Sequence, residues 1–179
     1  PNIRIFSFFR GEGVPVESTR DAVMTGLRLL ADEAEKERVT LLHENEKDIY
    51  GDTPERVLDL VETVASPALR LAWDSANFVQ VGVAHPHDDG YAKLRPYLDY
   101  LQVKDAVAAT GEVVPAGQGD GQVLQTVQAL AADGYTGFAS LEPHLAQAHA
   151  LGGFSGPVAF GEAARAFAAL LAEAGVSTR

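Results

Sequence analysis

Four apolar runs in this sequence stop abruptly on polar or ionisable residues, and no other feature constrains the fold as much. Each run has the length and residue types of a β-strand, so each polar ending marks a strand's carboxyl end. In parallel α/β proteins these ends converge on one face, where active sites are built. We therefore expect the polar endings to lie together. The runs occupy residues 39–46, 69–74, 98–105 and 137–142.

Helical patterns alternate with these runs, and a further strand is expected at residues 3–9. Helical connections of this length demand right-handed crossovers between parallel strands. Five strand–helix units result, which fit either a doubly wound sheet or part of a (β/α)8 TIM barrel. Five units cannot close an eight-stranded barrel. The expected helical segments lie at residues 24–34, 57–64, 88–97, 123–130 and 163–171.

The composition excludes several classes of protein. The chain has 179 residues, enough for one domain, and a formal net charge of -11 from 25 acidic and 14 basic residues. This charge argues against a nucleic-acid surface, which needs clustered Lys and Arg. Cysteine is absent, and no apolar run approaches the ~20 residues of a membrane helix. We expect no nucleic-acid partner, no membrane partner and a cytoplasmic location.

Four acidic residues stand at the expected strand ends, namely Glu44, Asp74, Asp105 and Glu142. Hard divalent cations prefer oxygen ligands, so two or three of these carboxylates at one edge would bind one. A single strand-end acid is more often solvated or caps the next helix, but recurrence on four strands favours a shared site. His43 should point to the face opposite Glu44, where it packs and does not ligate.

Several other residues near the strand ends are weaker candidates. Arg10, Lys47 and Lys104 could meet a sugar hydroxyl or a phosphate, with ordinary surface charge as the alternative. His144, just after the last run, is either a site residue or a loop histidine. The glycine-rich loop at residues 115–121 could cradle phosphate, but it lacks the Gly-Lys-Ser/Thr ending of a P-loop. Four aromatic residues either wall a pocket or pack in the core: Phe8, Phe9, Trp73 and Phe78.

Five segments together resemble the C-terminal part of the xylose isomerase-like TIM-barrel family of sugar and sugar-phosphate isomerases and epimerases. The resemblance implies strands four to eight of a barrel, as a single partial TIM-barrel domain over residues 1–179. The first three βα units are then missing, and a further N-terminal segment or a homo-oligomer would complete the barrel. The segments are Leu42-His-Glu-Asn45, Trp73-Asp-Ser-Ala-Asn77, Gln102-Val-Lys-Asp105, residues 115–121 and residues 134–144.

The same resemblance implies a divalent metal ion, Mn, Mg, Co or Zn, held at the ends of strands five to eight. Its ligands would be Glu44, Asp74, Gln102 and Glu142. Position 102 departs from the family pattern, because it carries glutamine in place of histidine, although an amide oxygen can also ligate a hard cation. Asn77 likewise stands where the family commonly has histidine. Taking position and resemblance together, we expect the substrate contacts to be Arg10, Lys47, Asn77, Asp105 and His144.

These residues imply a metal-dependent isomerase or epimerase that acts on a sugar or sugar phosphate. The metal would polarise the carbonyl of the open-chain sugar, and Glu44 or Glu142 would remove the adjacent α-proton. Lys104 would help to stabilise the enediolate, and the other glutamate would return a proton. A polyol (inosose-type) dehydratase and a catalytically incomplete partial barrel are the alternatives. A DNA-repair endonuclease, also found in the family, is disfavoured by the acidic charge.

Overall fold

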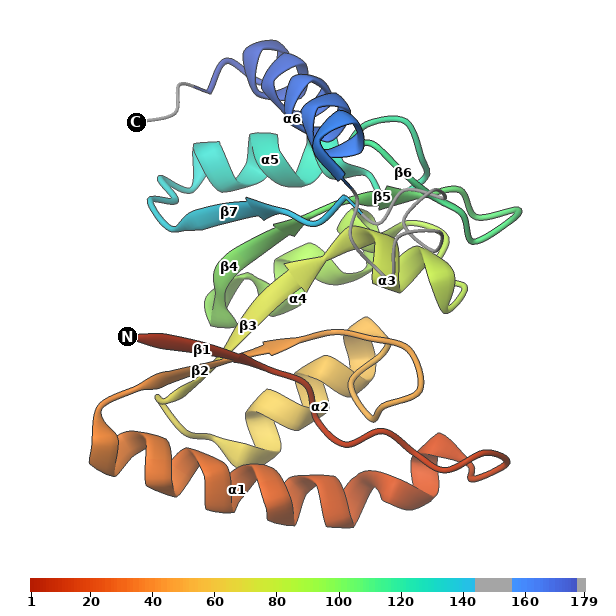
Figure 1. The fold of residues 1–179 in the computed structure, drawn as a ribbon. Helices are drawn as coiled ribbons and strands as arrows, with labels where there is room; N and C mark the ends of the chain where they lie inside the picture. Colours follow the sequence, from red (N-terminus) through yellow and green to blue (C-terminus); the bar gives the residue numbers. More distant parts are fainter. Residues whose placement is uncertain (144–155, 177–179) are drawn as a thin grey trace.

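The computed structural model describes residues 1–143 and 156–176, and its centre is a curled sheet of five parallel strands (Figure 1). These strands lie side by side in the order in which the chain forms them. A doubly wound sheet reverses its strand order partway across, so the sequential order identifies part of a barrel. The α/β partial-barrel prediction is confirmed. The strands are β1 (Asn2–Ile5), β2 (Thr40–Glu44), β3 (Leu69–Asp74), β4 (Leu98–Val103) and β7 (Phe138–Leu141).

Helices connect the strands and pack on the sheet. Figure 1 shows α1 and α2 beside β1 to β3, and α5 and α6 beside β7. No helix in the described ranges is long and apolar enough to cross a membrane. The longer helices are α1 (Arg20–Glu37), α2 (Pro54–Val64), α5 (Val123–Ala132) and α6 (Gly156–Glu173). The short elements are α3 (Ser75–Gln80), α4 (Ala92–Leu94), η1 (Val16–Thr19), η2 (His87–Tyr91), η3 (Arg95–Tyr97), and the antiparallel pair β5 (Asp105–Ala106) and β6 (Val113–Val114).

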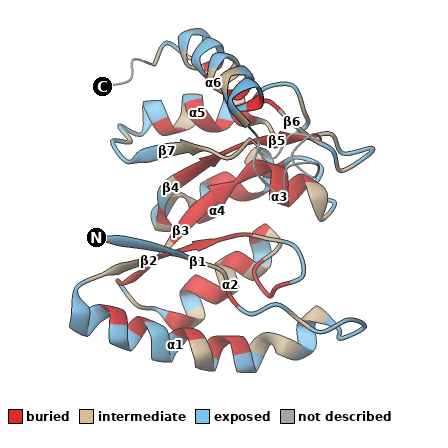
Figure 2. Cartoon of the chain, viewed as in Figure 1, coloured by how far each residue is buried: buried red, intermediate tan, exposed pale blue. Residues whose placement is uncertain are grey.

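Alternate residues of each strand face the helices, and most of these positions are apolar, with His43 of β2 as an exception. In β3 they are Leu69, Leu71 and Trp73, which belong to the main core. Figure 2 shows this burial concentrated in the central strands and on the sides of the helices that face them. The intervening positions face the inner side of the curled sheet. There Asp74 pairs in register with Gln102, so polar residues of neighbouring strands form a row.

The first strand and α3 differ from the expectation, the antiparallel pair β5–β6 was not expected, and the helix expected at residues 88–97 is a succession of the short elements η2, α4 and η3. The first strand ends at Ile5 and does not continue to residue 9, because Ser7 Oγ donates a 2.7 Å hydrogen bond to the carbonyl of Tyr50. An isolated antiparallel bridge at Phe9 then holds the chain away from the sheet. Helix α3 is not among the expected helices. Its N-cap is Asp74, whose carboxylate accepts a 2.9 Å hydrogen bond from the third residue of the helix, satisfying a free N–H group.

The two outermost strands leave open edges. Within residues 1–143 and 156–176, β1 pairs only with β2 and β7 pairs only with β4. The edge residues Ile3 and Phe138 are 49% and 71% exposed. An open edge presents unpaired N–H and C=O groups, and the exposed apolar side chains on it favour contact with a further strand.

His43 lies on the helix side of β2 and is fully buried. Neither ring nitrogen has a hydrogen-bond partner among the described residues. Gly51 lies against it, and a Cβ atom there would approach the ring carbon Cε1 to 2.7 Å. Burial lowers the pKa of His43 to about 4, so the ring is neutral near pH 7. An unpaired polar ring in a packed core is destabilising.

We expect His43→Leu to raise the free energy of unfolding by about 1 kcal/mol at pH 7, because it removes buried polar atoms without partners. The difference in the free energy of unfolding between the variant and wild type should increase toward pH 5. With the folded pKa lowered to about 4, the unfolded chain takes up a proton that the folded chain does not, and wild type therefore loses stability as pH falls. Urea denaturation at both pH values measures this. The exposed His85→Leu is the control, and destabilisation by His43→Leu at both pH values would contradict the assignment.

Candidate metal and catalytic site

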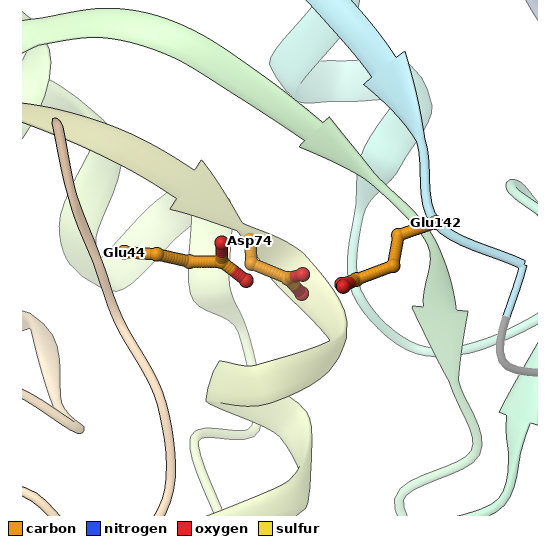
Figure 3. A group of neighbouring side chains, drawn as sticks. All are labelled: Glu44, Asp74 and Glu142. Atoms are coloured by element: carbon orange, nitrogen blue, oxygen red, sulfur yellow. The ribbon is translucent and has the colours of Figure 1, made fainter. Parts of the chain in front are cut away.

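Three carboxylates from distant parts of the chain meet at the carboxyl ends of the parallel strands. Glu44 ends β2, Asp74 ends β3, and Glu142 directly follows β7. One oxygen of each lies within 4.8 Å of the others. Figure 3 shows the three side chains, here called the acidic trio, pointing toward one another. The expected convergence of strand ends therefore holds for these three residues.

Two cations neutralise part of the acidic trio. Lys104 Nζ, just past β4, lies 3.2 Å from Asp74 Oδ2 and 2.8 Å from Glu142 Oε2. Arg4 Nη1, from β1, lies 2.9 Å from Glu44 Oε2 and 3.3 Å from Glu142 Oε1. The two oxygens of Glu142 thus face different cations. Lys104 is buried, whereas the Arg4 side chain is 45% exposed.

Burial and mutual repulsion change the protonation of the trio. Burial raises the pKa of Glu44 to about 8, and repulsion by Asp74 and Glu142 adds to the rise. Burial likewise raises the pKa of Asp74 to about 6, against the pull of Lys104. Burial opposes the charge of Lys104, but Asp74 and Glu142 outweigh it and raise the pKa of this ammonium. Glu44 therefore tends to hold its proton near neutral pH.

Two asparagines orient the trio. Asn45 exchanges two hydrogen bonds with the backbone of Asp74, at 2.8 and 2.9 Å. Asn77 donates to Glu44 Oε1 at 3.4 Å and to the carbonyl of Asn45 at 2.8 Å. The backbone N–H of Asn77 also donates to Asp74 Oδ1 at 2.9 Å. Asn77, expected to contact substrate, thus lies beside two members of the trio.

Gln102 lies on the same inner face, in register with Asp74 on one side and Ser140 on the other. Its side-chain oxygen accepts a hydrogen bond from the hydroxyl of Ser140. The amide oxygen that would ligate a metal is therefore engaged by a neighbouring strand. Rotation of the Ser140 hydroxyl would release it.

Asp105 does not join the acidic trio; the glycine-rich loop at residues 115–121 wraps around its side chain. It is fully buried. Its carboxylate accepts hydrogen bonds of 2.8–3.1 Å from the backbone N–H groups of Ala106, Gly117, Gly119 and Gly121. The loop amides that could hold a phosphate bind this carboxylate instead. A Cβ atom at Gly119 would lie 2.4 Å from the carbonyl oxygen of Ala106, so this close wrapping requires glycine.

The remaining expected substrate residues lie apart from the trio or outside the description. The Arg10 side chain donates to the carbonyl of Val14 and pairs with Asp48 at 2.7 Å. Lys47 is exposed in the loop after β2. His144 lies outside the described residues. Of the aromatic candidates, two are core residues at 1–2% exposure, Trp73 and Phe78, and two are exposed, Phe8 and Phe9.

Arg4 is the member of the site that motif reasoning misses. A signal was present: in the strand Asn2–Ile5, Arg4 stands between two isoleucines, so period-two alternation puts it on the face opposite to theirs. In register it pairs with Leu42, two residues before Glu44 on the same face of β2. A charged residue on the inner face of a strand points to a polar site.

The residues present fit a divalent cation. The acidic trio offers hard oxygen donors from three strands at mutual distances that one ion can span. Asp74 Oδ2 accepts no hydrogen bond from the described residues and faces the Lys104 ammonium. The lysine and arginine contacts hold the carboxylates together in the arrangement that an ion would require.

The chain belongs to the xylose isomerase-like TIM barrel family, whose sequence profile matches residues 2–176. No curated protein sequence matches it. A solved structure of an IolI protein with a bound zinc atom is similar, with 17% identity and a TM-score of 0.73 over 96% of this chain and 63% of that one. At this identity the likeness establishes the fold.

Two further solved structures each match 78% of this chain with a TM-score of 0.66. A D-tagatose 3-epimerase-like protein is 20% identical, and 54% of its length is covered. A probable 3-DHS dehydratase from Bacillus anthracis is 21% identical, and 56% of its length is covered. The chain therefore spans little more than half the length of these two proteins.

We expect Asp105→Ala to lower the free energy of unfolding by about 4 kcal/mol, because it leaves four backbone N–H groups without their charged acceptor. Asp120→Ala is the matched control in the same loop. Asp120 is exposed and accepts one backbone hydrogen bond, from Ala108, so its loss should cost about 1 kcal/mol. Urea denaturation compares the two variants, and equal losses would show that Asp105 does not anchor the loop.

Proposed function

We propose that this protein is a metal-dependent isomerase or epimerase of a sugar or sugar phosphate. The observation that carries the proposal is the acidic trio, which gathers three strand ends around a volume that one cation can fill. Membership of the xylose isomerase-like family, and structural similarity to an epimerase-like protein, support the same reaction class. The zinc atom in the IolI protein supports a divalent ion, whose identity we leave open among Mn, Mg, Co and Zn.

Glu44, Asp74 and Glu142 would hold the ion, and the Gln102 amide oxygen would be a fourth ligand once Ser140 turns away. When bound, such an ion polarises a substrate carbonyl and stabilises negative charge on it. The ion also requires ionised carboxylates, so its binding releases the proton that burial keeps on Glu44. The affinity for metal should therefore increase from acidic pH toward pH 8.

The protein's own side chains would perform the proton transfers. Glu44 and Glu142 reach the site from different strands: Glu44 ends β2, and Glu142 follows β7. One would remove the proton next to the carbonyl, and the other would return a proton to the opposite face or to the neighbouring carbon. Lys104, kept as an ammonium by Asp74 and Glu142, would donate a hydrogen bond to the enediolate oxygen.

A polyol dehydratase is the second candidate, because the probable dehydratase resembles this chain as closely as the epimerase-like protein does. Dehydration begins with the same proton removal but then expels a hydroxide from the next carbon. The two reactions differ in product mass: a dehydratase product lacks one water, whereas an epimerised or isomerised sugar keeps the mass of its substrate.

Glu142→Gln should reduce kcat on the sugar that the protein turns over by at least about 100-fold, because the amide cannot accept the proton. The rate of deuterium incorporation from D2O at the carbon beside the carbonyl measures that step directly. Glu112→Gln, in an exposed loop, is the control and should exchange at the wild-type rate. Unchanged exchange in Glu142→Gln would remove this residue from the proposed mechanism.

We also propose that further βα units close the barrel, carried by the same chain or by a second copy. The open edges of β1 and β7 support this, as does the coverage of only about half of the similar solved structures. A partial barrel with no such completion would be the catalytically incomplete alternative. The cytoplasmic location, and the absence of nucleic-acid and membrane partners, stay predictions.

A protein consisting of residues 1–179 alone should self-associate at micromolar concentration, because its exposed sheet edges are available to a second copy. Light scattering coupled to size-exclusion chromatography measures this. Phe138→Lys, on the β7 edge, should reduce association, since charges at an edge oppose pairing. Leu29→Lys is the control, because it changes a similarly exposed side chain on α1. A stable monomer at all concentrations would contradict open-edge pairing.

A further inference from the structure

Arg4 occupies an unusual position among the charged residues of the site. It enters from β1, at the open edge of the sheet, and reaches across the inner face to Glu44 and Glu142. Only Nη1 takes part in its hydrogen bonds to the described residues. The guanidinium carbon lies 5.3 Å from the ring centre of Phe6, which supports the plane of the group. Nε and Nη2 are therefore left to bind another acceptor.

The charge balance of the site indicates what that acceptor is. The acidic trio supplies three negative charges when ionised, and Arg4 and Lys104 supply two positive charges, which leaves one net negative charge. A divalent ion held by the trio reverses this to one net positive charge. Lys104 contacts Asp74 and Glu142 and is 7% exposed, so it stays with the carboxylates. Arg4 is half exposed, so it is the cation whose charge is no longer needed by the carboxylates once the ion is bound.

A surplus guanidinium beside a metal site favours an anionic ligand. Arginine binds carboxylate and phosphate groups through two parallel hydrogen bonds, which an ammonium cannot do. The chain as a whole carries a net charge of -11, so long-range attraction does not bring an anion to it. Recognition of an anion must come from a local cation on the inner face, and Arg4 has the reach and the free donors.

We propose that Arg4 binds an anionic group of the substrate, a carboxylate or a phosphate, so that the protein acts on a charged polyol and discriminates against the neutral sugar. This rests on the proposed function, because the surplus charge arises only when the trio holds a divalent ion. Arg4 would move from the glutamates to the substrate anion when the ion binds. Its role is to set substrate class, whereas the trio and Lys104 act at the carbonyl.

Binding measurements test this without relying on turnover. The full-length protein is loaded with Mn2+ and titrated by calorimetry with three polyols of one carbon skeleton: neutral D-glucitol, D-gluconate and D-glucitol 6-phosphate. Wild type should bind at least one of the two anions about tenfold more tightly than glucitol, since a charge-assisted pair contributes on the order of 1.5 kcal/mol. The anion that binds more tightly shows whether Arg4 recognises a carboxylate or a phosphate.

Arg4→Gln should abolish the preference for the anion while the variant still binds Mn2+. Arg4→Lys should keep part of it, because the charge remains and the paired donors are lost. Arg70→Gln is the matched control: Arg70 pairs with Asp99 at 3.0 Å near the start of β3, at the other end of the strands, and its loss should leave the preference intact. Thermal melting of each variant confirms that it is folded.

Equal affinity of wild type for the three polyols would overturn the proposal, and so would an anion preference that survives in Arg4→Gln. In both cases intact Mn2+ binding would leave the proposed function standing. Absence of Mn2+ binding by wild type, with unchanged deuterium exchange in Glu142→Gln, would instead overturn the proposed function and this inference with it.

Discussion

The mutual repulsion of three carboxylates at one point is the constraint on which the rest of the structure depends. Glu44 and Asp74 are almost completely buried, and removing carboxylates from water costs several kcal/mol each unless cations or donors compensate. The compensation comes from other strands: Lys104 from the end of β4 and Arg4 from β1. Parallel pairing of neighbouring strands is what brings five such side chains to one place, since the carboxyl ends of the strands share one edge.

The sequence predicts the parts of this site that follow from periodicity. Apolar runs ending on Glu44, Asp74 and Glu142 are visible without a structure, and strict alternation with helices forces the parallel arrangement. Two features escape because they depend on tertiary contacts. The first strand stops at Ile5 because Ser7 bonds to Tyr50, 43 residues away, and no local signal marks that contact. Alternation in β1 marks Arg4 as facing the inner side, but its distance in sequence from Glu44 and Glu142 conceals these partners.

Asp105 illustrates a different limit of sequence reasoning. Its position after a strand makes it equivalent to the other strand-end acids, and the glycine-rich loop resembles an anion-binding element. Each of the two features is recognisable alone, but only the fold shows that they bind each other. Burial raises the pKa of Asp105, and the hydrogen bonds from the loop N–H groups oppose that rise. The loop is thereby fixed next to Lys104, which immediately precedes Asp105 in the chain.

The open sheet and the charge balance are linked through Arg4 and Glu142. Arg4 lies on one edge strand, β1, and Glu142 directly follows the other, β7; the two residues are 138 positions apart in the chain and form an ion pair across the inner face. The sheet must therefore curl enough to bring its own edges within reach of one another at the carboxyl ends. A divalent ion in the trio would take over the role of Arg4 in holding the two edges together. The same ion that organises the proposed chemistry would then also stabilise the curvature that a complete barrel requires.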